Sequence, residues 1–189
     1  MSPMVVQLAR FHNRIVRATL LLGSWGVSFV GDARVAIEIE RKFRVAGEGW
    51  RTADGQRYCQ GYLSRERGRT VRVRVVGEQA WLTIKGETVG ATRLEFEYSI
   101  PRADADELLR LCAGPLVEKV RHKIELGGVT WEVDEFLGDN AGLVVAEVEL
   151  QREDQEFPRP EWLGEEVTGD PRYFNSNLAI RPYREWGTG

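Results

Sequence analysis

The stretch that decides the fold is AIEIERKFRV, residues 36–45. Strand-forming apolar residues alternate there with charged ones, and successive residues of a β-strand point to opposite faces of a sheet. The stretch therefore predicts a strand with one apolar face and one charged face, the latter carrying Glu38, Glu40 and Lys42.

The same alternation recurs along most of the remaining chain. Its charged positions are Arg72 and Arg74, Glu95 and Glu97, Lys119 and Arg121, Glu132 and Asp134, and Glu147 and Glu149. Glycine and short polar clusters separate the segments, which is typical of antiparallel hairpins. We predict strands at residues 36–45, 57–63, 68–75, 80–85, 92–100, 117–126, 129–136 and 143–150. A helix should open at Pro101 and end before Gly114-Pro115, and a helical tail should start at Asp170-Pro171.

The composition sets broad limits. A chain of 189 residues with 42% hydrophobic content can bury one good core, so one domain is the default. The net charge of −3 offers no basic field for a nucleic acid. Two cysteines without metal-ligand spacing suggest a reducing compartment, and we expect a cytoplasmic protein. Two histidines exclude a histidine metal cluster, and no apolar run reaches the ~18 residues of a membrane helix.

Residues 1–34 differ from the rest of the chain. Arg10, Arg14 and Arg17 precede a largely apolar run at residues 18–30, and no acidic residue appears before Asp32. This pattern fits a secretory signal, an arginine-rich transit segment, or a misassigned start codon with translation beginning near Val35. We favour the third reading. Residues 1–34 are then an atypical extension, disordered or a start-site artefact, and residues 35–189 form the domain.

Eight antiparallel strands can close into a barrel, which removes both sheet edges. Charges on the outside, in water, would be the simplest arrangement. The helix, however, carries an apolar stripe of Leu108, Leu109 and Leu111 that needs an apolar wall to cover. We therefore predict an α+β fold: an eight-stranded antiparallel β-barrel, or tunnel, with a charged lumen and helices packed outside. A dry lumen would cost several kcal/mol per charge, so it must hold water, metal ions and a charged ligand.

The charges of this lumen suit a metal-bound polyanion. Carboxylates at i and i+2 project in parallel, so Glu38/Glu40 and Glu147/Glu149 can each share a hard cation. Sites with oxygen ligands alone suit Mg²⁺ or Mn²⁺. The paired guanidinium groups of Arg72 and Arg74 can bind phosphate oxygens through two hydrogen bonds each. Carboxylates that hold metals beside cations that hold phosphates are what phosphoanhydride chemistry needs.

These residues also carry a family resemblance. EIERK at residues 38–42 resembles the ExExK signature of the CYTH superfamily, the triphosphate tunnel metalloenzymes. The later family positions follow in matching order and spacing: Arg72 and Arg74, Lys85, Glu95 and Glu97, Lys119 and Arg121, Asp134, and Glu147 and Glu149. Residues 169–179, GDPRYFNSNLA, look like the family's closing segment. The resemblance runs from about Val35 to Tyr183, and the short length and the EIERKF opening most resemble the small bacterial inorganic triphosphatases.

The resemblance implies metal-dependent hydrolysis of inorganic triphosphate (tripolyphosphate) to pyrophosphate and phosphate by water, with two Mg²⁺ or Mn²⁺ ions. The implied metal ligands are Glu38, Glu40, Asp134, Glu147 and Glu149, with Glu95 and Glu97 as further acids that reach the metal directly, through water or through the basic residues. The implied triphosphate ligands are Lys42, Arg72, Arg74, Lys85, Lys119 and Arg121. Lys42 and Tyr62 are the implied catalytic residues, although Tyr62 could equally be a wall aromatic. Arg93, Lys123 and Glu132 share the inward parity and lie either in the tunnel or at its mouth.

Other activities are compatible with the same residues. The superfamily also includes class IV adenylyl cyclases and thiamine or nucleoside triphosphatases, and a non-catalytic triphosphate- or polyphosphate-binding module would need a similar lumen. We expect a triphosphate-containing small molecule as the partner, no nucleic acid, no membrane, and a homodimer as one possible assembly.

Overall fold

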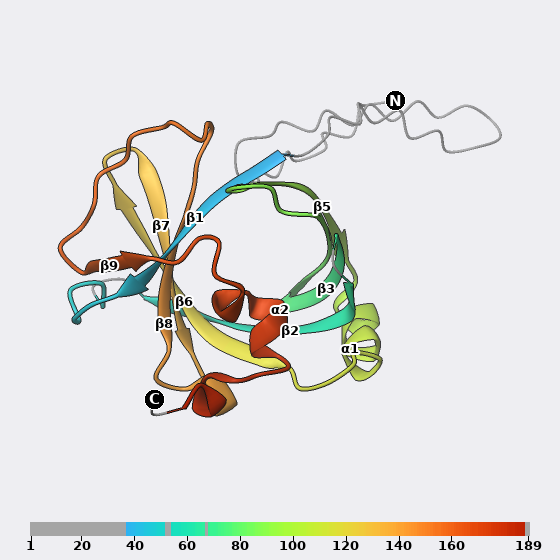
Figure 1. The fold of residues 1–189 in the computed structure, drawn as a ribbon. Coiled ribbons are helices and arrows are strands. Elements are labelled where there is room, and N and C mark those ends of the chain that lie inside the picture. Colours follow the sequence, from blue (N-terminus) through green and yellow to red (C-terminus); the bar gives the residue numbers. More distant parts are fainter. Residues whose placement is uncertain (1–36, 52–53, 67, 188–189) are drawn as a thin grey trace, which may run out of the picture. The chain divides into compact units, whose positions relative to one another are not determined.

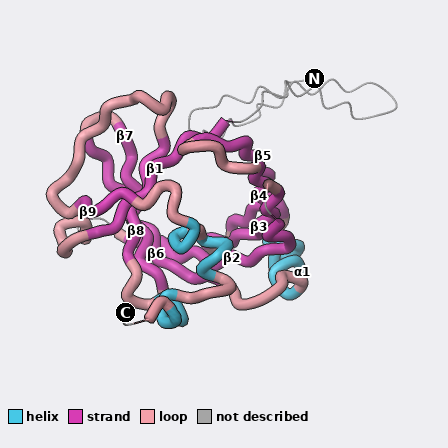
Figure 2. The backbone as a smooth tube through the Cα atoms, viewed as in Figure 1, coloured by secondary structure: helices cyan, strands magenta, loops and turns pink. Residues whose placement is uncertain are grey.

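The computed structural model describes residues 37–51, 54–66 and 68–187 (Figure 1). These residues form nine strands and few helices (Figure 2). The strands are β1 (Ile37–Val45), β2 (Gly55–Glu66), β3 (Arg69–Val76), β4 (Gln79–Gly86), β5 (Thr92–Ile100), β6 (Val117–Leu126), β7 (Val129–Phe136), β8 (Val144–Glu149) and β9 (Leu163–Glu166). The helices are α1 (Arg102–Arg110) and α2 (Asn175–Leu178), with 3₁₀ turns η1 (Gly138–Asn140), η2 (Pro171–Tyr173) and η3 (Tyr183–Glu185).

The strands form one antiparallel sheet that closes on itself. Its order is β5-β4-β3-β2-β6-β7-β8-β1-β9, and an additional pairing of β5 with β1 joins the first eight strands into a ring. Glu40 of β1 lies opposite Glu149 of β8, and Glu38 lies opposite Arg93 of β5. The ring confirms the predicted tunnel-like sheet and places the charged first strand at its closure.

Two glycines at one tight turn allow β6 and β7 to pair directly. Gly127 and Gly128 connect β6 to β7 with φ values of +57° and +82°. Two consecutive left-handed residues are what a two-residue type I′ hairpin requires, and glycine adopts them without steric cost. This turn fixes the register that sets Arg121 opposite Asp134.

The outer face of β2, β3 and β4 is apolar and is covered by α1. Ala105 of the helix is fully buried with Val73 and Val75, and Leu108 and Leu109 pack against the same cluster. This confirms the predicted outward position of the valines. The prediction for Leu111 was wrong, because α1 ends at Arg110 and the side chain beyond it is 72% exposed.

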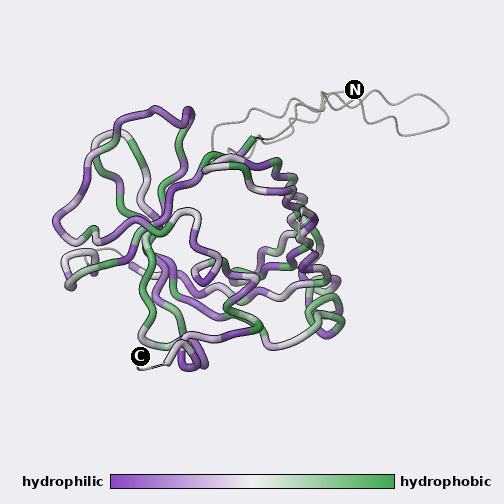
Figure 3. Tube along the Cα trace, in the orientation of Figure 1, coloured by the Kyte–Doolittle hydropathy of each residue, from purple (hydrophilic) through white to green (hydrophobic). Residues whose placement is uncertain are grey.

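A second apolar cluster covers the outer face of β1, β7 and β8. Phe43, Trp131 and Val148 pack there with Leu150 and Trp162, which come from the segment after β8. Loop residues rather than a helix therefore shield this part of the wall. Figure 3 shows the hydrophilic and hydrophobic residues that alternate along the strands of the ring.

The alternation located eight strands, and 92–100, 117–126 and 129–136 match β5, β6 and β7 in both bounds. Strand β9 was not predicted, because its four residues, LGEE, have no alternation to detect. The helical tail is confirmed: the Asp170 side chain accepts a hydrogen bond from the Arg172 backbone N–H at the start of η2. Within the described residues no helix is long and apolar enough to cross a membrane. The expectations for residues 1–34 lie outside the described residues and stay predictions.

Candidate active site in the lumen

Four strands contribute five of the six buried charged residues among the described residues. Lys42 Nζ lies 2.5 Å from Glu147 Oε1, and Arg121 Nη2 donates to Glu147 Oε2 at 2.8 Å. Arg121 Nε also donates to Asp134 Oδ1 at 2.6 Å, and Lys119 pairs with the same carboxylate. All five side chains are at most 8% exposed. β1, β6, β7 and β8 thus meet in one alternating network of acids and bases.

This network shifts the pKa of each basic group differently. Burial favours the neutral amine of Lys42, but Glu147 and Glu40 raise its pKa above the ordinary value. Burial and the neighbouring Arg121 lower the pKa of Lys119 to about 8, although Asp134 opposes the shift. The pKa of Glu147 lies well below its ordinary value because Lys42 and Arg121 outweigh the effect of burial. The carboxylate therefore stays ionised inside the lumen.

A second group surrounds the first glutamate of the ExExK segment. Lys85 Nζ lies 3.2 Å from Glu38 Oε2 and 2.7 Å from Glu95 Oε2. Arg93 Nε donates to the same oxygen, Glu38 Oε2, at 2.5 Å, and Arg93 Nη2 lies 3.8 Å from Glu40 Oε1. Burial raises the pKa of Glu95, but Lys85, a hydrogen bond with Glu38 and the charge of Arg72 together lower it to about 2.

The arginine pair of β3 forms a third group. Arg74 Nη2 donates to Glu97 Oε2 at 2.7 Å, and Arg72 Nη2 donates to Thr83 Oγ1 at 3.1 Å. Burial and the adjacent Arg72 lower the pKa of Arg74 to about 10. The Nε atoms of both arginines are buried and have no hydrogen-bond partner among the described residues. Each guanidinium group therefore has one N–H that no described residue satisfies.

Two aromatic rings flank Arg74. Its Cζ lies 5.7 Å from the ring centroid of Tyr58 and 5.5 Å from that of Trp81. Tyr58 also faces Arg121 and Lys119, at 5.4 Å and 6.0 Å. Cations over aromatic faces are attracted by the ring quadrupole, so these rings hold the basic groups in place.

Tyr62 lies at one end of the lumen. Its hydroxyl accepts a hydrogen bond from Gln60 Nε2 at 3.1 Å, and burial raises its pKa to about 12 despite the nearby Arg72 and Lys42. The ring belongs to an apolar cluster with Val117, Phe136 and Val145, whose other members come from the C-terminal segment: Val167, Tyr173, Leu178 and Ala179. The C-terminal segment thus packs into the lumen at this end.

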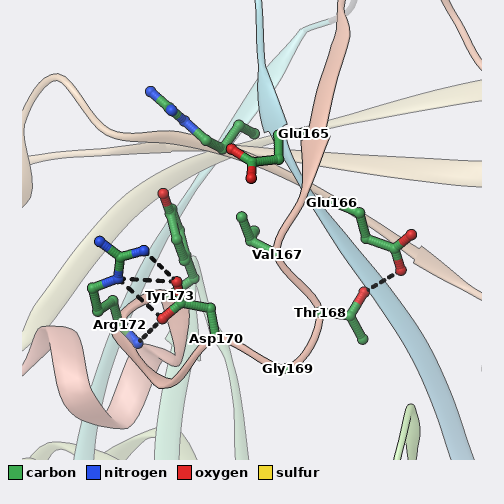
Figure 4. A pocket seen from close by; sticks show the side chains of 9 residues that line it. Glu165, Glu166, Val167, Thr168, Gly169, Asp170, Arg172 and Tyr173 are labelled. Carbon is green, nitrogen blue, oxygen red and sulfur yellow. Dashed lines mark hydrogen bonds and ion pairs between the residues drawn. The ribbon is translucent and has the colours of Figure 1, made fainter.

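A pocket of about 520 Å³ lies next to this C-terminal segment (Figure 4). Its lining comes from β1 and from the segment that runs from β9 to η2: Arg44, Glu165, Glu166, Val167, Thr168, Gly169, Asp170, Arg172 and Tyr173. None of the predicted catalytic, substrate-binding or metal-binding residues is among these described lining residues. The pocket is therefore separate from the charged network.

The carboxylates near the ExExK segment fit a hard divalent cation by their chemistry. Partial burial and the neighbouring Glu38 and Glu95 raise the pKa of Glu149 to about 7, so this region carries more negative charge than its cations neutralise. Carboxylate oxygens are the ligands that Mg²⁺ and Mn²⁺ prefer. Within the described residues, however, no three acidic, histidine or cysteine side chains converge as metal ligands. Asp134 and Glu147 are instead paired with lysine and arginine.

The alternation thus placed the predicted site residues in one lumen, but it missed some of their neighbours. Tyr58, Gln60, Trp81 and Thr83 share the inward parity of Tyr62 and Lys85, and that parity was the signal that could have found them. Arg93 lies in the lumen, in contact with Glu38. Thr168, which accepts a hydrogen bond from the Lys42 backbone, gave no signal because it belongs to a loop.

Comparison with known proteins agrees with this geometry. A model of the CYTH domain matches residues 36–183. An inorganic triphosphatase from Acetivibrio thermocellus is 51% identical over 151 residues, which cover 79% of this chain and 97% of that protein. An inorganic triphosphatase from Nitrosomonas europaea is 38% identical over 151 residues, with 76% and 97% covered. A solved crystal structure of an inorganic triphosphatase has a TM-score of 0.57 at 37% identity, covering 76% of this chain and 94% of its own.

Proposed function

The chain belongs to the CYTH family, and from this premise we propose that its lumen hydrolyses inorganic triphosphate to pyrophosphate and phosphate with a divalent metal ion. The relatives of 51% and 38% identity are both inorganic triphosphatases. The observation that carries the proposal is the pair of buried, unpartnered donors Arg72 Nε and Arg74 Nε. Buried donors of this kind are costly unless a ligand satisfies them, and phosphate oxygens suit guanidinium groups.

The basic side chains would bind the substrate. Lys42, Lys119 and Arg121 lie on one side of the lumen, whereas Arg72, Arg74 and Lys85 come from β3 and β4. Cations on both sides can hold the three phosphoryl groups in line and stabilise the charge that develops on the leaving pyrophosphate.

Glu38, Glu40 and Glu149 would hold the metal, with Asp134 and Glu147 as further candidates. Mg²⁺ or Mn²⁺, in one or two ions, would neutralise phosphate oxygens. A lumen carboxylate would orient the attacking water. The water oxygen would bond to the terminal phosphorus and lose a proton to that carboxylate and then to solvent. The bond from that phosphorus to the bridging oxygen would break, and pyrophosphate would leave with the bond's electron pair. Of the predicted catalytic residues, Lys42 would contact the phosphate, and Tyr62 would position the neighbouring cations.

The test is an assay of the purified protein with tripolyphosphate and either Mg²⁺ or Mn²⁺, with phosphate and pyrophosphate measured separately. We expect equal amounts of the two products and no turnover with a chelator. Parallel reactions with ATP and thiamine triphosphate, assayed for phosphate and for cyclic AMP, test the alternative activities. Binding of triphosphate without release of phosphate at any pH would instead identify a binding module. A homodimer and a cytoplasmic location stay predictions.

A further inference from the structure

Arg93 makes contacts that set it apart from the other basic residues of the lumen. Both of its ion pairs among the described residues go to the ExExK glutamates: Nε to Glu38 at 2.5 Å, and Nη2 to Glu40 at 3.8 Å. Lys85, the other cation near Glu38, is shared with Glu95. The guanidinium of Arg93 thus neutralises the two carboxylates that a metal would need as ligands.

The position of Arg93 is fixed by the backbone. Glu38 and Arg93 are directly opposite residues in the β1–β5 ladder. Directly opposite side chains on one face lie about 5 Å apart at their Cβ atoms, so the backbone keeps the two charges within reach of each other. The side chains of Arg93 and Glu38 are 21% and 15% exposed, which limits the screening of their attraction by water.

Arg93 and a divalent metal cannot use the same carboxylates without cost. A cation a few ångströms from a metal ion repels it, and a carboxylate that accepts hydrogen bonds from a guanidinium is a weaker metal ligand. A metal that arrives alone must therefore displace Arg93 from both of its carboxylate partners and brings no new partner for the guanidinium. A metal that arrives on a triphosphate brings phosphate oxygens that can accept the displaced guanidinium.

We propose that Arg93 is the internal counter-cation of the Glu38/Glu40 pair, which it holds until a metal–triphosphate complex enters, and that it then transfers to a phosphate oxygen. This inference rests on the proposed function. Its consequence is that the metal binds weakly by itself and more strongly together with the substrate, a coupling that is reciprocal by linkage. Arg93 then couples metal binding to substrate binding.

The test measures Mn²⁺ binding alone, by the loss of the electron paramagnetic resonance signal of free Mn²⁺, in the full chain and its variants. Arg93→Gln should bind Mn²⁺ about tenfold more tightly than the wild type, because a repelling charge is removed. Arg93→Lys keeps the charge and should stay near the wild type. Arg110→Gln removes an exposed charge from α1, where it pairs with Glu107, and should change nothing. With saturating Mg²⁺, Arg93→Gln should show a raised KM for triphosphate.

A second measurement follows the wild type and needs only the charge-conserving Arg93→Lys variant, for assignment. The Arg93 Nε–H resonance, assigned by its absence from the spectrum of Arg93→Lys, should move little with Mg²⁺ alone and strongly with Mg²⁺ and triphosphate together. Equal Mn²⁺ affinity of Arg93→Gln and wild type, or an unmoved resonance, overturns the inference while tripolyphosphate hydrolysis by the wild type still supports the proposed function. No hydrolysis by the wild type overturns both.

Discussion

The backbone amide of Lys42 donates to the hydroxyl of Thr168, with 3.1 Å between Lys42 N and Thr168 Oγ1. The pairing of β1 with β5 ends at Ile39, and its pairing with β9 begins at Phe43. Between the two partners a loop side chain completes the bonding of the strand, and the Lys42 carbonyl accepts from Val167 N at 2.8 Å. The backbone of the predicted catalytic lysine is thus held by the C-terminal segment.

Removing this hydroxyl should loosen Lys42. Thr168→Val has nearly the same shape but leaves the Lys42 amide unpaired, so we expect a loss of about 1–2 kcal/mol in unfolding free energy. The turnover number should fall as well, because the lysine is less well positioned. Thr168→Ser keeps the hydroxyl and should preserve activity. Denaturant unfolding and phosphate release measure the two effects, and equal behaviour of the Val and Ser variants would contradict this role.

Substitution of Glu147 should lower both activity and stability, and a second substitution should separate the two effects. Glu147→Gln should abolish triphosphate hydrolysis and destabilise the fold, because Lys42 and Arg121 lose the charge that neutralises them. The double variant Lys42→Met/Glu147→Gln removes one of these uncompensated charges and should recover part of the stability without any recovery of turnover. Thermal unfolding and phosphate release are compared for the two variants. A Glu147→Gln protein with the wild-type rate at saturating Mg²⁺ would remove this carboxylate from the site.

Trp81 should affect substrate binding through Arg74. Trp81→Phe keeps an aromatic face for the guanidinium, whereas Trp81→Leu leaves Tyr58 as its ring partner. A contact of this kind contributes about 0.5–2 kcal/mol, so Trp81→Leu should raise the KM for triphosphate by roughly 2- to 30-fold. Steady-state kinetics decide the point, and the Phe variant should stay near the wild type. A changed turnover number with an unchanged KM would argue against this role.

A side chain at Gly61 should lower the unfolding free energy of the protein. A Cβ on this residue of β2 would lie 2.7 Å from Cys112 Sγ and 2.8 Å from Leu116 Cδ2. Overpacking of this kind costs about 1–3 kcal/mol, which Gly61→Ala should show in denaturant unfolding. Gly169→Ala is the matched control, because nothing lies within 4 Å of its added Cβ. Equal stability of both variants would mean that the segment around Cys112 moves aside freely.

The alternation of charge in the sequence predicted the ring and the lumen position of the acids and bases, because parity alone decides the face of a strand. It did not predict the apolar end of the lumen. Val117 and Val145 have the same inward parity as Lys119 and Glu147, yet they pack with Tyr173 and Leu178. Whether an inward position meets ions or an apolar segment depends on where the distant C-terminus docks.

The ion-pair partners could not be predicted from the sequence either, because they depend on the register between strands. Arg93 meets Glu38 because β5 closes on β1 with one particular alignment, and a shift of one residue would turn Arg93 to the outside. The four-residue strand β9 and the Thr168 hydroxyl have no periodic pattern. Their places follow from the path of the chain after β8, which no local signal determines.

The closure of the ring has a consequence for how the wall opens. In the part of the chain that the structure describes, β1 and β5 share three residue pairs, whereas β3 and β4 share eight. The short β1–β5 pairing lies beside Glu38, and local opening of the ring should begin there. A ligand that binds charged side chains of both strands should stabilise this pairing. Amides of β1 and β5 should then gain more protection from solvent hydrogen exchange on ligand binding than those of β3 and β4.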